Sequence, residues 1–157
     1  NMDRDAMTLH DERQNQVAEA AAHTTLPPGV SIRPWREADF TVIRQLSLAE
    51  SWATPRNRPG IYLRAWHRSW PALVAEHRGE VIGFLRALTD GVVTTYVAEL
   101  LVAQEWRRRG IGQALLDTCQ LLHPTTRLDV LSARSAERFY KSVGFRRCAG
   151  YRKRRQQ

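Results

Sequence analysis

The feature of the sequence that most constrains the fold is an apolar segment that leads directly into an arginine-rich loop with two closely spaced glycines. The apolar segment ends at Val102, the loop covers residues 107–112 (RRRGIG), and a helical pattern with one apolar face continues to Leu122. Glycines in such a loop permit positive φ angles and close approach of a ligand, and the free amides at the start of a helix favour a phosphate. The segment therefore predicts a strand, a loop and a helix that together hold a pyrophosphate.

Two other phosphate-binding patterns do not fit this loop. A Walker A loop needs a Gly-Lys-Ser/Thr sequence, which is absent, and the dinucleotide fingerprint needs a third glycine. A tight strand-to-helix turn that binds no ligand, with its arginines on a solvated face, fits the loop equally well when the loop is taken alone. The surrounding sequence has to decide between these interpretations.

Short apolar runs alternate with breaker residues along the rest of the chain and predict an α/β fold with a mixed sheet between helices. The expected order is β-α-α-β-β-β-α-β-α-β, with a right-handed parallel crossover between Glu99 and Leu131. The expected strands cover residues 30–35, 72–75, 81–85, 92–102, 127–131 and 145–151. The expected helices cover residues 37–49, 110–122 and 136–143, with a short aromatic helix around residues 62–66.

The composition indicates one globular domain with a strongly basic surface. The chain has 157 residues, 43% of them hydrophobic, and a net charge of +8, with −3 in residues 1–25 and +11 in residues 26–157. Such a surface attracts anions: nucleic acid, acidic lipid or a phosphorylated small molecule. No apolar run approaches the roughly 18 residues of a membrane span and no secretory signal is visible, so a cytoplasmic protein is expected. Cys119 and Cys148 fit no metal or disulfide pattern, so we expect two reduced thiols and no metal.

A breaker cluster at residues 24–29 (TTLPPG) suggests where the compact domain begins. Residues 1–29 are expected to form an N-terminal extension that is weakly helical over residues 7–22, and residues 30–157 to form the domain. Asn1, which precedes Met2, is expected to be left over from expression.

Two further segments match a known pattern together with the loop. Residues 136–145 read AERFYKSVGF, and residues 31–34 read SIRP. With the Arg-x-x-Gly-x-Gly of the loop, they resemble the GCN5-related N-acetyltransferase (GNAT) family over about residues 30–151. The resemblance implies a mixed, mostly antiparallel central sheet with one splayed parallel pair of strands, and helices on both faces. It also implies transfer of an acetyl group from acetyl-CoA, the cosubstrate, to an amine by direct attack, without a metal.

The resemblance also implies roles for individual residues. Backbone groups of Leu101 and Val102 would pair with the pantetheine arm, and Tyr140 would protonate the departing thiolate. Apart from the resemblance, Glu99 is the candidate base because it is a carboxylate in an otherwise apolar strand, with water as the alternative. The pyrophosphate would be held by the loop and the helix start: Arg107, Arg108, Arg109, Gly110, Ile111, Gly112 and Gln113.

Each of these side chains also has a purely structural interpretation. Tyr140 fits a half-buried core aromatic residue, and Glu99 fits a carboxylate paired with an arginine on a neighbouring strand or pointing into solvent. A group of aromatic residues either lines the pocket for the acceptor amine or packs in the core. This group comprises Trp52, Tyr62, Trp66 and Trp70.

The chain departs from the family pattern at two places. Ala133 stands where relatives commonly have an asparagine that touches CoA, so this contact is absent or supplied by Arg134 or Ser135. Only 12 residues follow Phe145, where relatives usually have a two-stranded hairpin. We therefore expect an exposed sheet edge, covered by a second subunit in a homodimer or by the N-terminal extension.

The function expected from the sequence is an acetyl-CoA-dependent N-acetyltransferase acting on a small-molecule or peptide amine. The alternative is a catalytically silent module that binds acyl-CoA. A nucleic-acid-binding domain is disfavoured, because no helix-turn-helix, RNP-like or zinc pattern is present. Asp and Glu are sparse between Ser51 and Trp70, which weighs against polycationic acceptors such as aminoglycosides.

Overall fold

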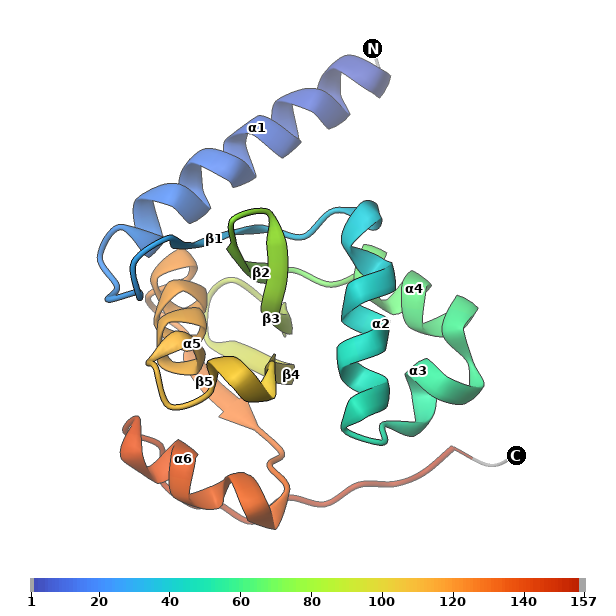
Figure 1. Cartoon of the computed structure of the whole chain (residues 1–157), viewed down its shortest axis with the longest axis vertical. Helices are drawn as coiled ribbons and strands as arrows, with labels where there is room; N and C mark the ends of the chain where they lie inside the picture. The colour runs from blue at the N-terminus through green and yellow to red at the C-terminus, as the bar shows by residue number, and fades with distance from the viewer. Residues whose placement is uncertain (1, 156–157) are drawn as a thin grey trace.

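The computed structural model describes residues 2–155, in which helices cover both faces of a five-stranded sheet (Figure 1). The sheet has the order β1-β2-β3-β4-β5; the first three pairings are antiparallel and the β4–β5 pairing is parallel. This confirms the mixed, mostly antiparallel sheet expected from the sequence, whereas Asn1 lies outside the described residues. The strands are β1 (Val30–Pro34), β2 (Ala72–His77), β3 (Glu80–Thr89), β4 (Thr94–Val102) and β5 (Arg127–Val130).

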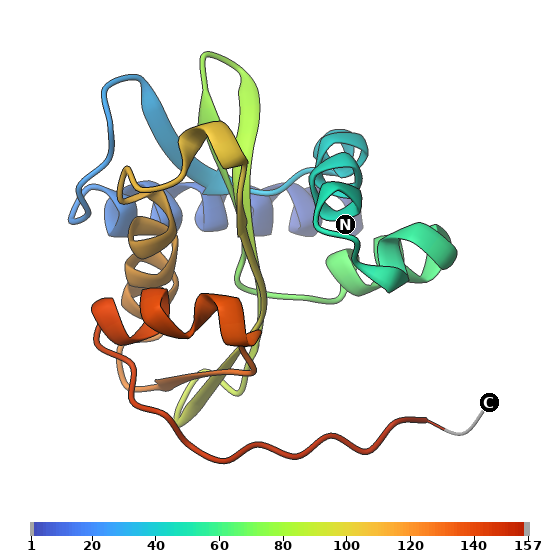
Figure 2. The same ribbon diagram turned by 60° about the horizontal axis from the view of Figure 1, so that its bottom comes forward.

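The helices form two layers, which Figure 2 shows with the sheet between them. Helices α2, α3 and α4 lie against one face, and α5 and α6 lie against the other. The connection from β4 through α5 to β5 is the expected parallel crossover. The helices are α1 (Met2–Ala21), α2 (Phe40–Ala49), α3 (Ala53–Asn57), α4 (Pro59–His67), α5 (Ile111–Leu122) and α6 (Glu137–Ser142), with 3-10 turns η1 (Glu37–Asp39), η2 (Gln104–Trp106) and η3 (Arg134–Ala136).

The sheet separates two hydrophobic cores, because successive side chains of a strand point to opposite faces. Leu85 of β3 packs into the core under α5, whereas its neighbour Phe84 packs into the core under α2 and α4. The core under α5 includes Leu73, Val97, Leu115 and Cys119. The core under α2 and α4 includes Ile43, Tyr62, Trp66 and Leu101.

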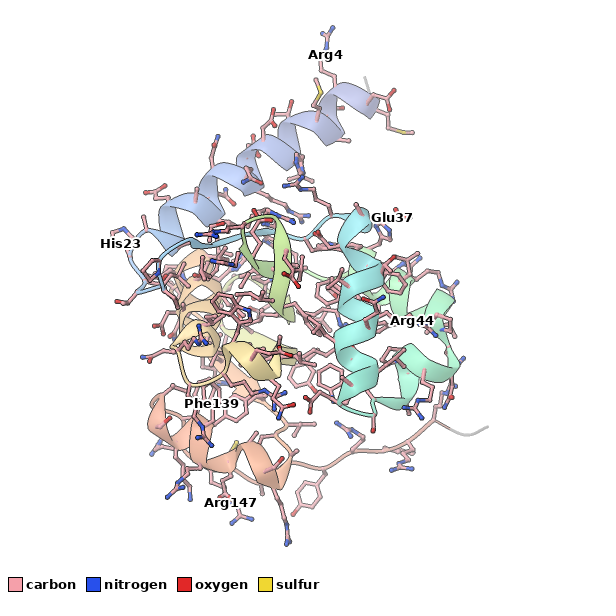
Figure 3. All side chains as sticks on the ribbon, viewed as in Figure 1. Arg4, His23, Glu37, Arg44, Phe139 and Arg147 are labelled. Carbon is pink, nitrogen blue, oxygen red and sulfur yellow. The ribbon has the colours of Figure 1, made fainter. Side chains whose placement is uncertain are left out.

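Helix α1 is longer than the weak helix expected over residues 7–22. Its C-terminal half packs on α5 and β1 and buries Val17 and Ala20, which supplies the tertiary contact that a weakly helical segment needs. Its N-terminal half projects beyond the sheet, with Arg4 near the far end (Figure 3). The domain boundary expected after residue 29 stays a prediction, since α1 contributes Val17 to the core under α5.

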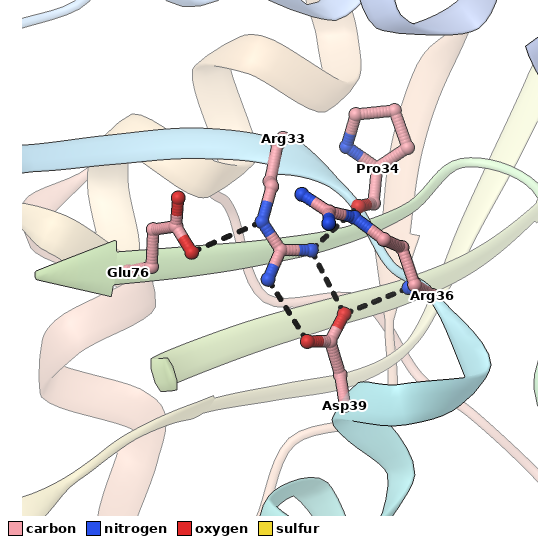
Figure 4. Close-up of polar contacts among 5 residues, drawn as sticks. All are labelled: Arg33, Pro34, Arg36, Asp39 and Glu76. Carbon is pink, nitrogen blue, oxygen red and sulfur yellow. Dashed lines mark hydrogen bonds and ion pairs between the residues drawn. The ribbon is translucent and has the colours of Figure 1, made fainter. Parts of the chain in front are cut away.

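A buried ion-pair network fixes the start of the fold (Figure 4). The guanidinium of Arg33 on β1 donates two hydrogen bonds to Asp39, at 2.8 and 2.9 Å, and its Nε donates to Glu76 on β2 at 3.1 Å. The backbone N–H of Arg36 donates to the same Asp39 carboxylate at 2.7 Å. Burial alone would raise the pKa of Asp39, but these hydrogen bonds outweigh it and hold the pKa below the usual range. The network joins β1, β2 and the turn that leads into α2.

The prediction of a strand at residues 145–151 is wrong. The sequence continues beyond α6 in extended backbone that pairs with no strand of the described chain. Two arginines follow Phe145, which is half-buried, and Cys148 and Tyr151 are exposed, so the segment has no apolar face to hold it on the sheet. Gly144, with a φ of +93°, directly follows Val143, the C-cap of α6.

Candidate active site

β4 and β5 separate part-way along β4. Residues 94–97 of β4 pair with residues 127–130 of β5, and β4 then continues to Val102 without this neighbour. The two strands are therefore splayed, as the resemblance to the family implied. The edge of β4 that has no strand partner beyond Val97 is called the opening below, and the loop at residues 107–112 follows β4 directly.

A β-bulge lies where the two strands separate. In the ladder with β3, Arg86 lies opposite Glu99 and Ala87 lies opposite Val97, so Ala98 is an extra residue on β4. A bulge bends its strand and reverses which side chains point to each face. Glu99 consequently points to the face covered by α2 and α4, opposite to the face that receives Val97.

The main-chain groups that face the opening follow from the same ladder. The N–H of Ala103 donates to the carbonyl of Ile82 at 2.8 Å, so Ala103 directs its main chain to the β3 side. Because alternate residues of an antiparallel strand bond to the same neighbour, Leu101 also faces β3, whereas Leu100 and Val102 face the opening. Of the two residues named from the sequence, Val102 thus faces the opening, and Leu100 is the one that sequence reasoning missed.

The loop presents a series of free main-chain N–H groups. Arg108 and Gly110 have φ angles of +62° and +81°, a pattern that turns successive N–H groups toward one side. Within the described residues, no hydrogen bond uses the N–H groups of residues 108–113. The Ile111 side chain is buried in the core, and that of Gln113 is exposed. Since these N–H groups also open α5, the loop combines free donors with the positive end of a helix dipole.

The arginines of the loop do not point in one direction. Arg107 turns back, donates from Nε to the carbonyl of Val102 at 2.9 Å, and pairs with Glu50 directly after α2. The Arg109 guanidinium lies over the ring of Trp106, 4.7 Å from its centroid. Arg107 therefore joins the loop, the end of β4 and the end of α2, and it occupies the carbonyl of Val102 at the opening.

Gly112 is small for a reason that the sequence did not predict. A Cβ atom at this position would lie 3.1 Å from Cζ of Phe139 and 3.9 Å from Cγ2 of Val102. Figure 3 labels Phe139 where α6 faces the loop before α5. Gly112 thus accommodates an aromatic side chain of the protein itself, whereas a Cβ on Gly110 would meet nothing within 4 Å and that glycine serves the positive φ.

Tyr140 lies on α6 in an aromatic cluster. Its ring centroid is 5.1 Å from that of Phe139 and 5.3 Å from that of Phe145. The residue is half-buried, and this burial raises the pKa of the phenol to about 12. The hydroxyl therefore keeps its proton at neutral pH, which a proton donor requires.

Glu99 lies in a polar network between the sheet and α4. Its carboxylate accepts a hydrogen bond from Tyr62 at 2.8 Å and pairs with Arg86 of β3 at 3.2 Å, with 14% of the side chain exposed. Ser47 of α2 lies 3.2 Å from the Tyr62 hydroxyl. Burial, followed by the charge of Glu99, raises the pKa of Tyr62. The arginine partner was one of the open sequence interpretations, whereas Tyr62 as a hydrogen-bond donor was missed because it lies 37 residues away.

The aromatic residues assigned to the acceptor side pack mainly as core. Tyr62 and Trp66 are fully buried, and Trp66 lies with its ring centroid 5.4 Å from that of Phe84. Trp52 is half-buried and packs edge-on against Phe84 at 6.2 Å. Packing therefore accounts for these three residues.

Residues 2–155 contain no cluster of three His, Cys, Asp or Glu side chains suited to holding a metal ion. None of the described helices combines the length and apolar character needed to cross a membrane.

The comparison with protein families shows which family the chain belongs to. The family of the acetyltransferase (GNAT) domain matches residues 68–147, which include β4, the loop, α5, β5 and α6. This chain belongs to the GNAT family. The match includes two of the three segments that carried the resemblance, the loop and residues 136–145, whereas residues 31–34 lie outside it.

Solved structures show the same GNAT fold. The Ard1 protein of Thermoplasma volcanium is 26% identical, with a TM-score of 0.63 over 77% of this chain and 85% of that one. A GNAT-family acetyltransferase of Streptococcus pneumoniae is 19% identical, with a TM-score of 0.67 over 82% of this chain and 98% of that one. The aminoglycoside N-acetyltransferase AAC(6')-Iy in complex with CoA is 20% identical, with a TM-score of 0.62 over 83% of this chain and 99% of that one. The curated proteins gave no significant sequence match.

Proposed function

We propose that this GNAT domain transfers the acetyl group of acetyl-CoA to the nitrogen of an amine. The observation that carries the proposal is the series of six free N–H groups at residues 108–113, at the start of α5 and next to the opening between β4 and β5. Such a group of donors suits a diphosphate, which is the part of CoA that a main-chain loop can recognise. The solved relative with bound CoA supports this cosubstrate.

In the proposed complex, the pyrophosphate binds the N–H groups of residues 108–113 and the pantetheine arm follows β4. Its amides pair with the main chain of Leu100 and Val102, which face the opening. The hydrogen bond from Arg107 Nε to the Val102 carbonyl has to open for this pairing. The exposed side chains of Arg108 and Arg109 add positive charge beside the phosphates.

The chemistry needs no more than positioning, an oxyanion donor and two proton transfers. The amine nitrogen attacks the thioester carbonyl, and a main-chain N–H at Leu100 or Val102 stabilises the oxyanion. The attacking nitrogen loses a proton to Glu99, directly or through water. As the carbon–sulfur bond breaks, Tyr140 donates its proton to the thiolate of CoA.

The charges next to the opening bear on the acceptor. Residues 53–68, which cover α3 and α4, contain four arginines and no acidic residue. Such a surface repels an acceptor with several positive charges. We therefore favour a small-molecule or peptide amine of low positive charge over an aminoglycoside, although two of the structural relatives are aminoglycoside acetyltransferases.

Three finer expectations stay predictions. They are the homodimer, the cytoplasmic location and the choice between an active enzyme and a silent acyl-CoA-binding module. Measuring the release of CoA thiol with a panel of amines distinguishes an active enzyme from a silent module. Cys148 has to be blocked first, because this exposed cysteine would otherwise react with the thiol reagent.

Loss of the positive φ at Gly110 is expected to weaken CoA binding about 30- to 100-fold. A β-branched residue at this φ costs roughly 1–3 kcal/mol, so Gly110→Val moves the loop and takes its N–H groups off the diphosphate. Each hydrogen bond to a charged group is worth about 1.5–3 kcal/mol. Isothermal titration calorimetry with CoA measures the change, and binding to the unmodified protein should weaken with added salt.

Gly79→Val is the matched control for this variant. Gly79 has a φ of +82°, and its Cβ would also meet nothing within 4 Å, but it lies in the turn between β2 and β3. Both variants should therefore lose similar stability, and only Gly110→Val should lose affinity. Equal CoA affinity in the two variants, or no CoA binding by the unmodified protein, would contradict the proposed loop.

Glu99→Gln is expected to lower kcat/KM about 10- to 100-fold at neutral pH, and less at high pH. A glutamine still accepts the hydrogen bond from Arg86 but takes up no proton, and at high pH the acceptor amine is already deprotonated. The pH profile of acetyl transfer measures this effect, with the exposed Glu80→Gln as control. A rate that is unchanged at every pH would assign proton removal to water.

A further inference from the structure

A groove runs along the outer side of β5 in the same molecule. Its volume is about 810 Å³, and it lies between β5, α6 and the extended segment that follows α6. Figure 2 shows this segment passing β5 below α6. Its lining includes Leu128, Val130, Leu131, Arg134, Tyr140 and Arg146.

The floor of the groove is an unpaired sheet edge. β5 is the last strand of the sheet, and within residues 2–155 it pairs with β4 alone. The N–H of Arg127 donates to the carbonyl of Val93 at 2.9 Å, so Arg127 directs its main chain toward β4. By the alternation of a strand, the main-chain groups of Leu128 and Val130 point outward into the groove. The edge therefore offers hydrogen-bonding groups to one further strand.

The apolar side chains around this edge are not fully covered. No residue of β5 or α6 is buried, and Leu131 is 46% exposed. Leu128, Val130 and Tyr140 are only half-buried, unlike their counterparts under α5. A strand laid along β5 would bury these side chains on alternate positions, as an added strand does in other sheets.

The rim of the groove is positively charged. Five basic and two acidic side chains line it. Arg127 pairs with Asp129, and Lys141 pairs with Glu137, which also lies 3.9 Å from Arg147. Arg134 and Arg146 have no acidic partner among the described residues. The rim thus favours an occupant with negative charge.

We propose that this groove binds an extended acidic peptide segment of a partner protein, which joins β5 as a sixth strand. Its main chain pairs with Leu128 and Val130, its apolar side chains cover Leu131 and Tyr140, and its carboxylates meet Arg134 and Arg146. The inference is independent of acetyl transfer, since it uses no contact with acetyl-CoA. It brings the partner next to Tyr140, so partner binding and activity become coupled if Tyr140 is the proton donor.

A second copy of the chain is a poorer occupant for this groove. The segment most suited to strand exchange, residues 145–155, contains six basic residues and no acidic one. Its docking would place like charges together on the basic rim, which is unfavourable. A nucleic acid would use the rim but would leave the sheet edge and the apolar side chains without partners.

The test uses Cys148, which lines the groove and is exposed. Burial raises the pKa of the other thiol, Cys119, to about 12, so a thiol-reactive environment-sensitive dye labels Cys148 selectively. A peptide of about six residues in which Val alternates with Glu is titrated against the labelled protein. We expect a saturable emission change, roughly tenfold weaker binding when Lys replaces Glu, and loss of binding when prolines replace the alternate residues that donate N–H groups to β5.

Charge reversal in the groove gives a second readout. The double variant Arg134→Glu with Arg146→Glu is expected to bind the Glu peptide roughly tenfold more weakly and the Lys peptide more tightly. Arg152→Glu with Arg154→Glu is the matched control, because these exposed arginines lie outside the groove lining and should change little.

Several outcomes would overturn the proposal. They are equal binding of the Glu and Lys peptides, proline-insensitive binding, or an oligonucleotide that competes with the Glu peptide at moderate salt. A dimer by light scattering in which the Cys148 dye is already shielded would assign the groove to a second copy.

Discussion

Tyr140→Phe is expected to lower kcat for acetyl transfer by about 10²- to 10⁴-fold, the usual contribution of a general acid. The phenylalanine keeps the contacts with Phe139 and Phe145, so KM for acetyl-CoA and thermal stability should change little. Because burial raises the pKa of Tyr140 to about 12, the phenol stays protonated and kcat should show no alkaline decline up to about pH 10. Thiol release at saturating acetyl-CoA measures the loss.

The control is Tyr96→Phe, which removes the hydroxyl of another half-buried tyrosine, on β4. This variant should keep kcat within about twofold, since the hydroxyl of Tyr96 has no role in the proposed proton transfers. If Tyr140→Phe releases thiol as fast as the unmodified protein, the leaving thiolate takes its proton from solvent. A loss of affinity for acetyl-CoA without a loss of kcat would instead make Tyr140 a binding residue.

Asp39→Ala is expected to lower the free energy of unfolding by about 3–5 kcal/mol, because it leaves the Arg33 guanidinium buried with part of its charge unpaired. Arg33 and Asp39 expose only 10% and 9% of their side chains, and the bidentate pair excludes solvent. For a domain of this size the midpoint of thermal unfolding should fall by roughly 10 °C. Denaturant unfolding followed by tryptophan fluorescence gives the free energy directly.

Asp129→Ala tests whether burial of the ion pair causes the large loss of stability expected for Asp39→Ala. Asp129 also pairs with an arginine, Arg127, but the two side chains are 45% and 67% exposed, so the loss should stay below about 1 kcal/mol. The pH dependence gives a further check. Because the pKa of Asp39 is lowered in the folded state, its stabilisation is present above about pH 4 and is lost as the pH falls through the folded pKa. The difference in the free energy of unfolding between Asp39→Ala and the unmodified protein should therefore disappear below about pH 4. A difference that stays constant with pH would contradict the ion pair as its cause.

Most of the fold could be predicted from local patterns. The apolar face of residues 111–122 and the glycine before it predict α5, and they occur within one short segment. The same holds for the hairpin of β2 and β3, whose turn carries Gly79. The strand expected at residues 145–151 failed because it rested on few apolar residues, and two arginines interrupt their spacing.

The details of the site could not be predicted in the same way, because they depend on residues far apart in the chain. Gly112 is small because of Phe139, 27 positions later, and no local pattern reveals that contact. Glu99 is bonded to Tyr62 across the interface between α4 and β4. Ala98 is a bulge only in relation to β3, so the sequence alone named Leu101 where Leu100 faces the opening.

The extra residue on β4 has a consequence for how this strand tolerates length changes. Because Ala98 is the extra residue, its deletion would leave a regular ladder in which Glu99 still points toward α2 and α4 and the main chain of Leu101 still faces β3. By contrast, a deletion or insertion of one residue between Glu99 and Val102, with Ala103 still bonded to Ile82, would turn Glu99 to the side of α5. The same change in the hairpin tip around Gly91, before β4 begins, leaves both assignments intact. The number of residues between Glu99 and the glycine loop therefore distinguishes relatives that keep this glutamate on the side of α2 and α4 from chains that only share the fold.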